Sequence, residues 1–184
     1  MRIISGKHKG RYLQAPKKLP VRPTTDMAKE ALFNILNNTY YLEDVILLDL
    51  FAGTGNISFE FASRGTTQLT AVDANHGCVK YIDKISEELD FNINTIKSDV
   101  FSFLKNVKQK STIIFADPPY DLPFEDFAKL PELVFTNELL VDDDDSLLII
   151  EHSKHTDLSS LDNFNNERRY GGSVFSFFKK GTDQ

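Results

Sequence analysis

Four consecutive residues near the middle of the chain can position a planar amine for reaction. Asp117, Pro118, Pro119 and Tyr120 follow the apolar run 112–116. The Asp117 carboxylate and the Pro118 carbonyl can each accept an N–H hydrogen bond from an exocyclic amine of a base. Such contacts favour a more pyramidal nitrogen whose lone pair points at an electrophile. Tyr120 offers a flat face on which an extruded base can stack.

The run before these four residues must hold them in place. Residues 112–116 are rich in β-branched and aromatic side chains, which is typical of a buried strand in a parallel sheet. Pro118 and Pro119 then end the strand, because neither can donate a backbone hydrogen bond. In open α/β sheets, ligands bind at the carboxyl ends of the strands. By itself the tetrapeptide also fits an ordinary strand end with a half-buried tyrosine.

A glycine-rich turn gives a second candidate site. Residues 49–56 join the predicted strand 45–51 to a helix, and Gly53 and Gly55 let the backbone approach a ligand at the helix N-terminus. Asp73 comes 20 residues after Gly53, at the end of the next strand, where an acid binds ribose hydroxyls in dinucleotide folds. This turn therefore fits nicotinamide enzymes and methyltransferases alike.

Three features favour a ligand that joins an amino acid to an adenosine. Ser58 stands where the dinucleotide fingerprint has Gly or Ala. Asp49 precedes the turn, where it can meet a cationic amine but not a pyrophosphate. Asp99 ends the third strand, where it can accept a hydrogen bond from an adenine amino group. Together these acids indicate a methyltransferase cofactor.

Strands and helices alternate along most of the chain, which predicts an α/β fold with a doubly wound parallel sheet and right-handed crossovers. A helix begins at Thr24 or Thr25 with an apolar stripe expected in the core: Met27, Ala28, Ala31, Leu32, Ile35 and Leu36. The other predicted helices are 56–64, 76–89, 100–107 and 124–140, the last interrupted by Pro131. The predicted strands are 45–51, 69–72, 93–97, 112–116 and 147–150, with a closing hairpin over 164–169 and 173–178.

Charge is unevenly distributed along the 184 residues. The net charge is −6, but residues 1–22 carry seven basic side chains and no acid, and the remainder carries 14 basic and 27 acidic ones. Residues 2–13 are predicted to form a hairpin that must lean on the body or on a partner, because two strands alone are marginal in water. We expect a phosphate-binding arm and connector over 1–22 and a separate domain over 23–184. The expected RNA contacts are Arg2, Lys7, Lys9, Arg11 and Arg22.

The amino-acid composition excludes several classes of protein. Cys78 is the single cysteine, which excludes an internal disulfide and a multi-cysteine zinc site and fits a reducing cytoplasm. No apolar run approaches the roughly 20 residues that span a membrane, and the N-terminus does not resemble a signal peptide. We expect no metal site: 152–155 is more typical of a loop, and the four acids 142–145 lack the alternation of a calcium loop.

Taken together, these motifs resemble the S-adenosylmethionine-dependent methyltransferases with a Rossmann-like seven-stranded sheet. They are similar, more narrowly, to the bacterial 16S ribosomal RNA guanine-N2 methyltransferases, the RsmD family. The resemblance rests on residues 1–6, 22–26, 30–36, 49–56, 63–65, 117–120 and 170–171. It implies the strand order 3-2-1-4-5-7-6 with the seventh strand antiparallel. It also implies methyl transfer to the N2 amine of one guanine in small-subunit RNA.

The resemblance assigns a role to each motif. The turn from Asp49 would cradle the methionine part of the cofactor, Asp73 would hold the ribose, Asp99 would face the adenine, and residues 117–120 would hold the guanine. Asp73 departs from the family, in which Glu is common at this position, and so does Thr54, where Ser is frequent. The expected cofactor-binding residues are Asp49, Phe51, Ala52, Gly53, Thr54, Gly55, Asn56, Asp73, Ala74, Asp99, Val100 and Thr24.

Three rival functions remain open at this point. A DNA adenine or cytosine amino-methyltransferase uses a similar Asp-Pro-Pro-aromatic motif, although 184 residues leave little room for a target-recognition region. A ribosome-assembly or RNA-binding factor could use the fold without chemistry. A nicotinamide oxidoreductase is disfavoured by Asp49. The expected partner is 16S rRNA, in the small subunit or an assembly intermediate, with a cytoplasmic monomer as the enzyme.

Overall fold

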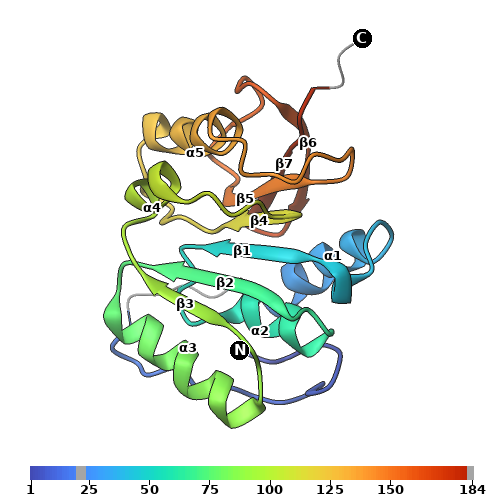
Figure 1. The fold of residues 1–184 in the computed structure, drawn as a ribbon, viewed down its shortest axis with the longest axis vertical. Helices are drawn as coiled ribbons and strands as arrows, with labels where there is room; N and C mark the ends of the chain where they lie inside the picture. Colours follow the sequence, from blue (N-terminus) through green and yellow to red (C-terminus); the bar gives the residue numbers. More distant parts are fainter. Residues whose placement is uncertain (20–23, 182–184) are drawn as a thin grey trace.

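The computed structural model describes residues 1–19 and 24–181, which form one sheet with helices on both faces (Figure 1). Its strands are β1 Ile46–Leu50, β2 Gln68–Asp73, β3 Asn94–Lys97, β4 Ile113–Ala116, β5 Leu147–Ser153, β6 Phe164–Tyr170 and β7 Ser173–Phe178. Its helices are α1 Asp26–Leu36, α2 Asn56–Ser63, α3 His76–Leu89, α4 Val100–Asn106 and α5 Phe124–Thr136, with a short 3₁₀ turn, η1, at Leu42–Asp44.

The strand order is β3-β2-β1-β4-β5-β7-β6. Strands β1 to β5 pair in parallel, and β7 runs antiparallel to both β5 and β6. The α/β fold class, the order 3-2-1-4-5-7-6 and the antiparallel seventh strand are therefore confirmed. This order places the carboxyl ends of β1 and β4 side by side at the middle of the sheet.

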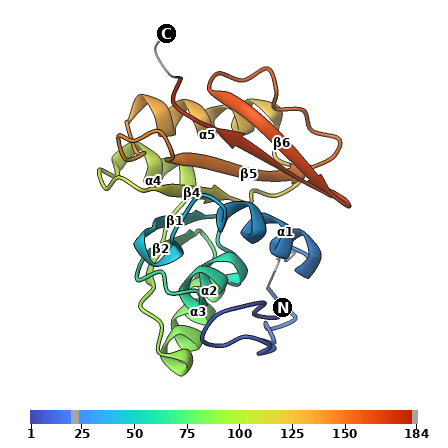
Figure 2. The ribbon, with the colours of Figure 1, turned by 90° about the vertical axis from the view of Figure 1, so that its right-hand side faces the viewer.

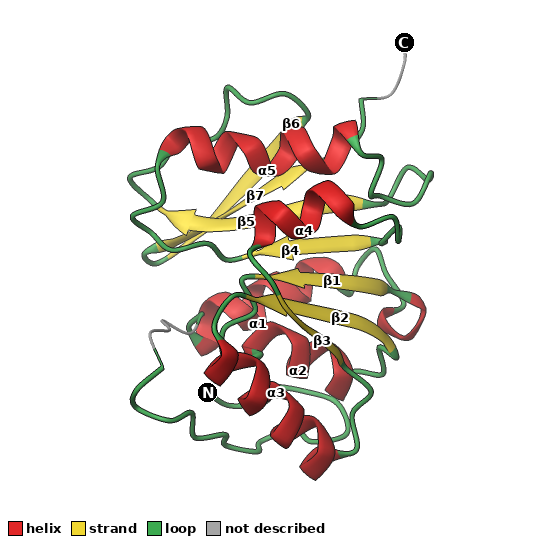
Figure 3. Cartoon of the chain, turned by 60° about the vertical axis from the view of Figure 1, so that its left-hand side comes forward, coloured by secondary structure: helices red, strands yellow, loops and turns green. Residues whose placement is uncertain are grey.

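Alternate residues of the central strands face two separate cores. In β1, Leu47 belongs to the core under α1, α2 and α3, whereas Leu48 belongs to the core under α4 and α5. Phe115 and Ile114 of β4 divide in the same way. Figure 3 shows α4 and α5 lying against the β4–β5–β7 part of the sheet. Burial on both faces explains why these strands are apolar throughout in the sequence.

Several local predictions were wrong. Pro131 lies inside α5 without ending it, and the helix stops at Thr136 instead of residue 140. The burial of Phe127 and Val134 on the same helix face offsets the missing hydrogen bond. Met27, expected in the core, is 60 % exposed. His152, expected in a loop, is fully buried in β5.

The first 13 residues, here called the N-terminal segment, form a loose hairpin that packs on the body. Backbone bonds join Ile3 to Arg11 and Gly10, but only Arg2 and Tyr12 form a β-bridge, so the predicted strands are shorter than expected. The expectation that the segment leans on the body is confirmed. The Lys7 N–H donates to the Ser63 carbonyl at 2.7 Å, at the end of α2. Figure 2 shows the segment beside α2 and α3.

Gly6 allows this close packing, which leads to a stability prediction. A Cβ at Gly6 would lie 1.8 Å from the Ser63 carbonyl oxygen, whereas a Cβ at Gly10 would meet no atom within 4 Å. Both glycines have a left-handed backbone, with φ of +82° and +85°. We therefore expect Gly6→Ala to lower the free energy of unfolding by about 1–3 kcal/mol more than Gly10→Ala does. Urea unfolding of both variants measures the difference, and equal losses would show that the segment does not pack tightly on α2.

Candidate active site

The loops after β1, β2, β3 and β4 surround a cavity of about 550 Å³. This volume lies in the range of small-molecule sites, roughly 300–1,000 Å³. The cavity lining includes the whole 117–120 tetrapeptide and every expected cofactor-binding residue except Gly55. Four lining residues were not expected there: Ile57, Asn75, Cys78 and Phe115. Elements far apart in the sequence thus bring both predicted sites into one cavity.

The glycine-rich loop bends sharply above β1. Phe51 and Gly53 both have positive φ, 56° and 55°, and the Ala52 N–H donates to the Val72 carbonyl of β2 at 3.0 Å. Gly55, the one expected cofactor-binding residue outside the cavity lining, lies at the start of α2. It is the left-handed N-cap of α2, and a Cβ there would lie 3.0 Å from atoms of Ile82 and Phe59. Its small size serves packing behind the loop.

Asp49 is a buried acid on the wall of the cavity. It is 2 % exposed, and its carboxylate accepts a hydrogen bond from the Ser58 hydroxyl at 2.5 Å. Burial raises the pKa of Asp49 to about 7, although the hydrogen bonds from Ser58 act in the opposite direction. A cation entering the cavity would favour the charged form of this carboxyl.

The other two acids each organise the backbone at a strand end. Asp73 accepts hydrogen bonds from the Gly53 and Asn75 N–H groups, both at 2.8 Å, so it ties the glycine loop to the end of β2. Asp99 caps α4 by accepting the Ser102 N–H at 2.8 Å. Carboxylate oxygens have capacity for more than one hydrogen bond each. Both acids can therefore hold the loops and still accept from a ligand in the cavity.

The tetrapeptide continues directly from β4. The Asp117 N–H donates to the Leu50 carbonyl at 3.3 Å, which places its side chain beside the end of β1. The Pro119 carbonyl accepts from the Leu122 N–H at 3.0 Å, which closes a turn after the tetrapeptide. The Tyr120 hydroxyl lies 3.2 Å from Ser173 Oγ at the start of β7. This contact fixes the position of the ring at the cavity wall.

The basic residues expected to contact RNA differ in their surroundings. Arg2 pairs with Asp26 at 3.2 Å, and Lys7 pairs with Asp90 at 3.3 Å. Lys9 and Arg11 are exposed, and no ion pair involves them within the described residues. Arg22 lies outside the described residues.

Sequence reasoning missed the buried polar residues behind the cavity. Lys29 of α1 and Glu60 of α2 are almost fully buried and lie 3.2 Å apart. Thr24 donates its hydroxyl to Glu151 at 2.6 Å and does not cap α1, which is capped by Thr25. The burial of Lys29 could have been predicted, because Lys29 precedes Leu32 and Leu36 at the helical spacing of a buried face.

Among residues 1–19 and 24–181, no group of three or more His, Cys, Asp or Glu side chains is placed to hold a metal ion. The same part of the chain contains no helix with the length and apolarity required to cross a membrane.

A glycine loop, three acids at strand ends and this strand order define a Rossmann-like, S-adenosylmethionine-dependent methyltransferase. A family profile described as Conserved hypothetical protein 95 matches residues 1–179, and the chain belongs to this family, the RsmD family of methyltransferases.

Similar proteins agree with this assignment. The Bacillus subtilis protein YlbH, named provisionally as an rRNA methyltransferase, is 31 % identical over 86 % of this chain and 85 % of its own length. The Escherichia coli (strain K12) ribosomal RNA small subunit methyltransferase D is 34 % identical over 65 % of this chain, an alignment that spans 60 % of that protein. A solved structure of the Escherichia coli protein yhhF, named provisionally as a methyltransferase, superposes with a TM-score of 0.84 and 26 % identity, covering 100 % of this chain and 99 % of the other.

Proposed function

We propose that this chain transfers a methyl group from S-adenosylmethionine to the exocyclic N2 amine of a guanine in small-subunit ribosomal RNA. The observation that carries the proposal is the shared cavity, in which Asp117 and Tyr120 lie with the glycine loop. The names of the relatives from Bacillus subtilis and Escherichia coli support an rRNA substrate. The choice of guanine N2 rests on the resemblance of the motifs to that family.

The residues around the cavity fit the proposed cofactor. Asp49 can pair with the ammonium of a methionine group, Asp73 can accept from ribose hydroxyls, and Asp99 can accept from an adenine amine. When bound, S-adenosylmethionine supplies an electrophilic methyl group on a sulfonium sulfur. The Phe51 ring and the Val100 side chain, both apolar, line the same cavity and would cover the adenosine. Acidic and apolar groups thus occur together where an amino acid joined to a nucleoside needs them.

The tetrapeptide would act on the nucleophile. Asp117 and the Pro118 carbonyl each accept one N–H of the amine, which turns the nitrogen lone pair toward the methyl group. As the N–C bond forms and the S–C bond breaks, the nitrogen becomes positively charged, and the Asp117 carboxylate stabilises that charge. The surplus proton leaves to water after the methyl group has arrived, so no strong base is required. Tyr120, held by Ser173, stacks on the base.

The proposed substrate has consequences for the binding partner, the cellular compartment and the oligomeric state. We infer that the basic segment docks on structured RNA, as 16S rRNA within a small subunit or an assembly intermediate. The enzyme would then act in the cytoplasm, and a monomer suffices because one chain supplies the whole cavity. Residues 1–22 would serve as the docking unit and residues 23–184 as the catalytic domain.

Product analysis tests the reaction. The purified protein is incubated with methyl-labelled S-adenosylmethionine and with unmethylated small subunits, naked ribosomal RNA or DNA in separate reactions, and each substrate is digested to nucleosides. We expect label in N2-methylguanosine from the subunits. Label in a methylated DNA base would instead indicate a DNA amino-methyltransferase. No label, with S-adenosylhomocysteine tightly bound, would contradict the proposed substrate.

The buried position of Asp49 predicts that cofactor binding depends on pH. With a pKa of about 7, Asp49 is mostly protonated at pH 6, and binding an ammonium must then displace that proton. We expect the affinity for S-adenosylhomocysteine to fall about tenfold for each pH unit below 7 and to level off above 8. Calorimetry from pH 5.5 to 8.5 measures this. Asp49→Asn should bind weakly at every pH, and a wild-type affinity that stays constant over the range would contradict the assignment of Asp49 to the ammonium.

The exposed cations of the N-terminal segment predict the salt dependence of RNA binding. Lys9 and Arg11 are available for phosphates, whereas Lys7 already has an acidic neighbour. Each phosphate contact contributes about 0.7–0.9 to the slope of log K against log salt. Replacing both residues with Ser should therefore lower the slope by about 1.4–1.8, measured by fluorescence anisotropy with labelled RNA. Lys105→Ser with Lys129→Ser is the matched control, and an equal effect of the two pairs would place the RNA elsewhere.

A further inference from the structure

The ammonium of Lys29 is surrounded by three oxygen acceptors from different parts of the chain. It donates to the Arg2 carbonyl at 2.6 Å and to Asn56 Oδ1 at 2.8 Å, and it lies 3.2 Å from Glu60 Oε2. An ammonium has three N–H donors, so this environment satisfies it fully. The side chain is 1 % exposed, and no water can replace a lost partner at low cost. Lys29 thus links the backbone of the N-terminal segment to α2.

The Lys29 partner Asn56 connects this cluster to the cofactor cavity. Asn56 lines it and donates through Nδ2 to the Thr24 carbonyl at 3.0 Å. Thr24 also lines it and donates its hydroxyl to Glu151 of β5. The first residue of the chain contacts the same region, because Met1 Sδ lies 4.0 Å from Thr54 Oγ1. The cavity wall and the segment therefore share one hydrogen-bonded network.

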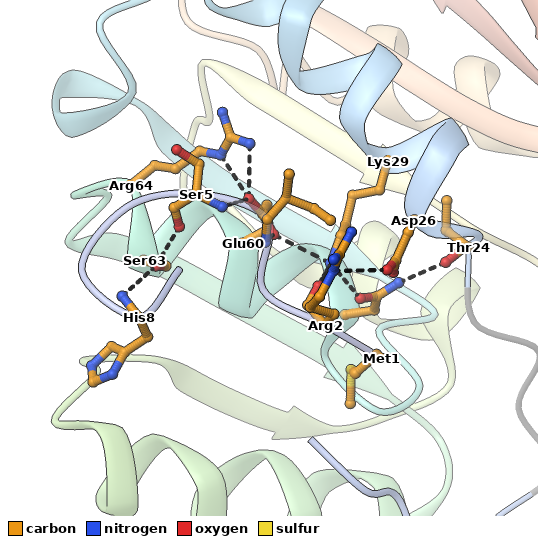
Figure 4. A network of polar contacts seen from close by, with 12 residues as sticks. Met1, Arg2, Ser5, His8, Thr24, Asp26, Lys29, Glu60, Ser63 and Arg64 are labelled. Carbon is orange, nitrogen blue, oxygen red and sulfur yellow. Dashed lines mark hydrogen bonds and ion pairs between the residues drawn. The ribbon is translucent and has the colours of Figure 1, made fainter. Parts of the chain in front are cut away.

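Glu60 holds the other part of the N-terminal segment. Its two carboxylate oxygens accept the Ile4 N–H at 2.8 Å and the Ser5 N–H at 3.0 Å. Arg64 binds the same carboxylate at 2.8 Å. Figure 4 shows Lys29, Glu60 and Arg64 gathered under the backbone of the segment. The segment is consequently fixed to the body by buried charges.

We propose that Lys29 is a positioning residue that couples the N-terminal segment to the cofactor cavity, so that a nucleic acid bound by the segment and the cofactor each strengthen the binding of the other. A cofactor that contacts Asn56 and Thr54 restrains the motion of this side of the cavity. Because Lys29 binds both Asn56 and the Arg2 carbonyl, the backbone at Arg2 is restrained as well. The second ligand then orders fewer groups and binds more tightly. Coupling of this kind is reciprocal, with the same factor in both directions. The nucleic-acid half of this inference rests on the proposed function.

Amide hydrogen exchange tests the coupling within the protein, without any RNA. In the wild-type protein, saturating S-adenosylhomocysteine should slow exchange at Ile4 and Ser5 by about threefold or more, although neither residue lines the cavity. An unchanged exchange rate at both amides would overturn the proposal, and this result needs no variant.

The variant Lys29→Met should remove that response. Its Ile4 and Ser5 amides still have Glu60 as acceptor, so they remain protected but no longer respond to the cofactor. Lys129→Met is the matched control, because Lys129 lies on α5 with an exposed side chain that pairs with the half-buried Asp126. A wild-type response in folded Lys29→Met would overturn the role of Lys29. Lys29→Gln, which keeps an N–H donor, serves the same comparison if the Met variant does not fold.

Calorimetry with an RNA fragment of the small subunit tests the partner. We expect saturating RNA to lower the Kd for S-adenosylhomocysteine by about fivefold or more in the wild-type protein and not in Lys29→Met. An RNA that binds without changing this Kd would overturn the proposed coupling. A failure of the proposed reaction looks different: the RNA would still tighten cofactor binding, but no N2-methylguanosine would form.

Discussion

Replacing Asp117 with alanine is expected to slow methyl transfer by about 10²–10³-fold and to leave the Kd for S-adenosylhomocysteine within about twofold of wild type. Asp117 lies at the end of β4, beside the end of β1, and in the proposed reaction it touches the target amine and not the cofactor. Its carboxylate orients the lone pair and stabilises the positive charge that develops on nitrogen. Both effects act in the transition state. Their loss in Asp117→Ala therefore lowers kcat and leaves the cofactor affinity unchanged.

Two further variants sharpen this test. Asp117→Asn keeps an oxygen acceptor but loses the charge, so its rate should lie between those of the wild type and Asp117→Ala. Asp121→Ala removes an exposed acid four residues away that does not line the cavity, and it should keep the wild-type rate. Single-turnover rates and calorimetry measure the two quantities separately. A parallel loss of rate and cofactor affinity in Asp117→Ala would show that Asp117 supports the cofactor site instead.

Replacing Glu60 with alanine is expected to lower the free energy of unfolding by about 3–5 kcal/mol. The side chain is fully buried, and its carboxylate pairs with Lys29 and Arg64. Removing it leaves two cations without a counter-charge and the Ile4 and Ser5 N–H groups without an acceptor. Burial already lowers the pKa of Lys29, and Glu60 opposes that effect. The variant would therefore favour a neutral Lys29 or a displaced segment.

The control for this prediction is an exposed pair on a neighbouring helix. Glu88 lies 3.7 Å from Lys84 on α3, with both side chains in solvent. Glu88→Ala should change the free energy of unfolding by no more than about 0.5 kcal/mol, because water screens exposed pairs. Urea unfolding of both variants gives the comparison. A loss in Glu60→Ala as small as that in Glu88→Ala would mean that the buried network contributes nothing to stability.

The sequence by itself determined the fold class and the composition of the cavity. Strand and helix periodicities are local, and prolines and glycines mark strand ends within a few residues. The 117–120 tetrapeptide and the 49–56 turn could therefore be recognised directly. The parallel arrangement then required their strand ends to meet at one edge of the sheet. Most expected cofactor-binding residues line the cavity for this reason.

Only the tertiary structure decided which polar groups meet behind the cavity. Lys29 contacts residues 2, 56 and 60, and Tyr120 contacts Ser173, across separations that no local pattern reports. Helical periodicity can place Lys29 on a buried face but cannot name its partners, because the rotation and register of packed helices depend on every side chain between them. Met27 is the opposite case: it is part of the predicted apolar stripe, yet the orientation of α1 leaves it exposed. Local sequence thus determined the groups available at each strand end, and packing between distant segments determined which of them are paired.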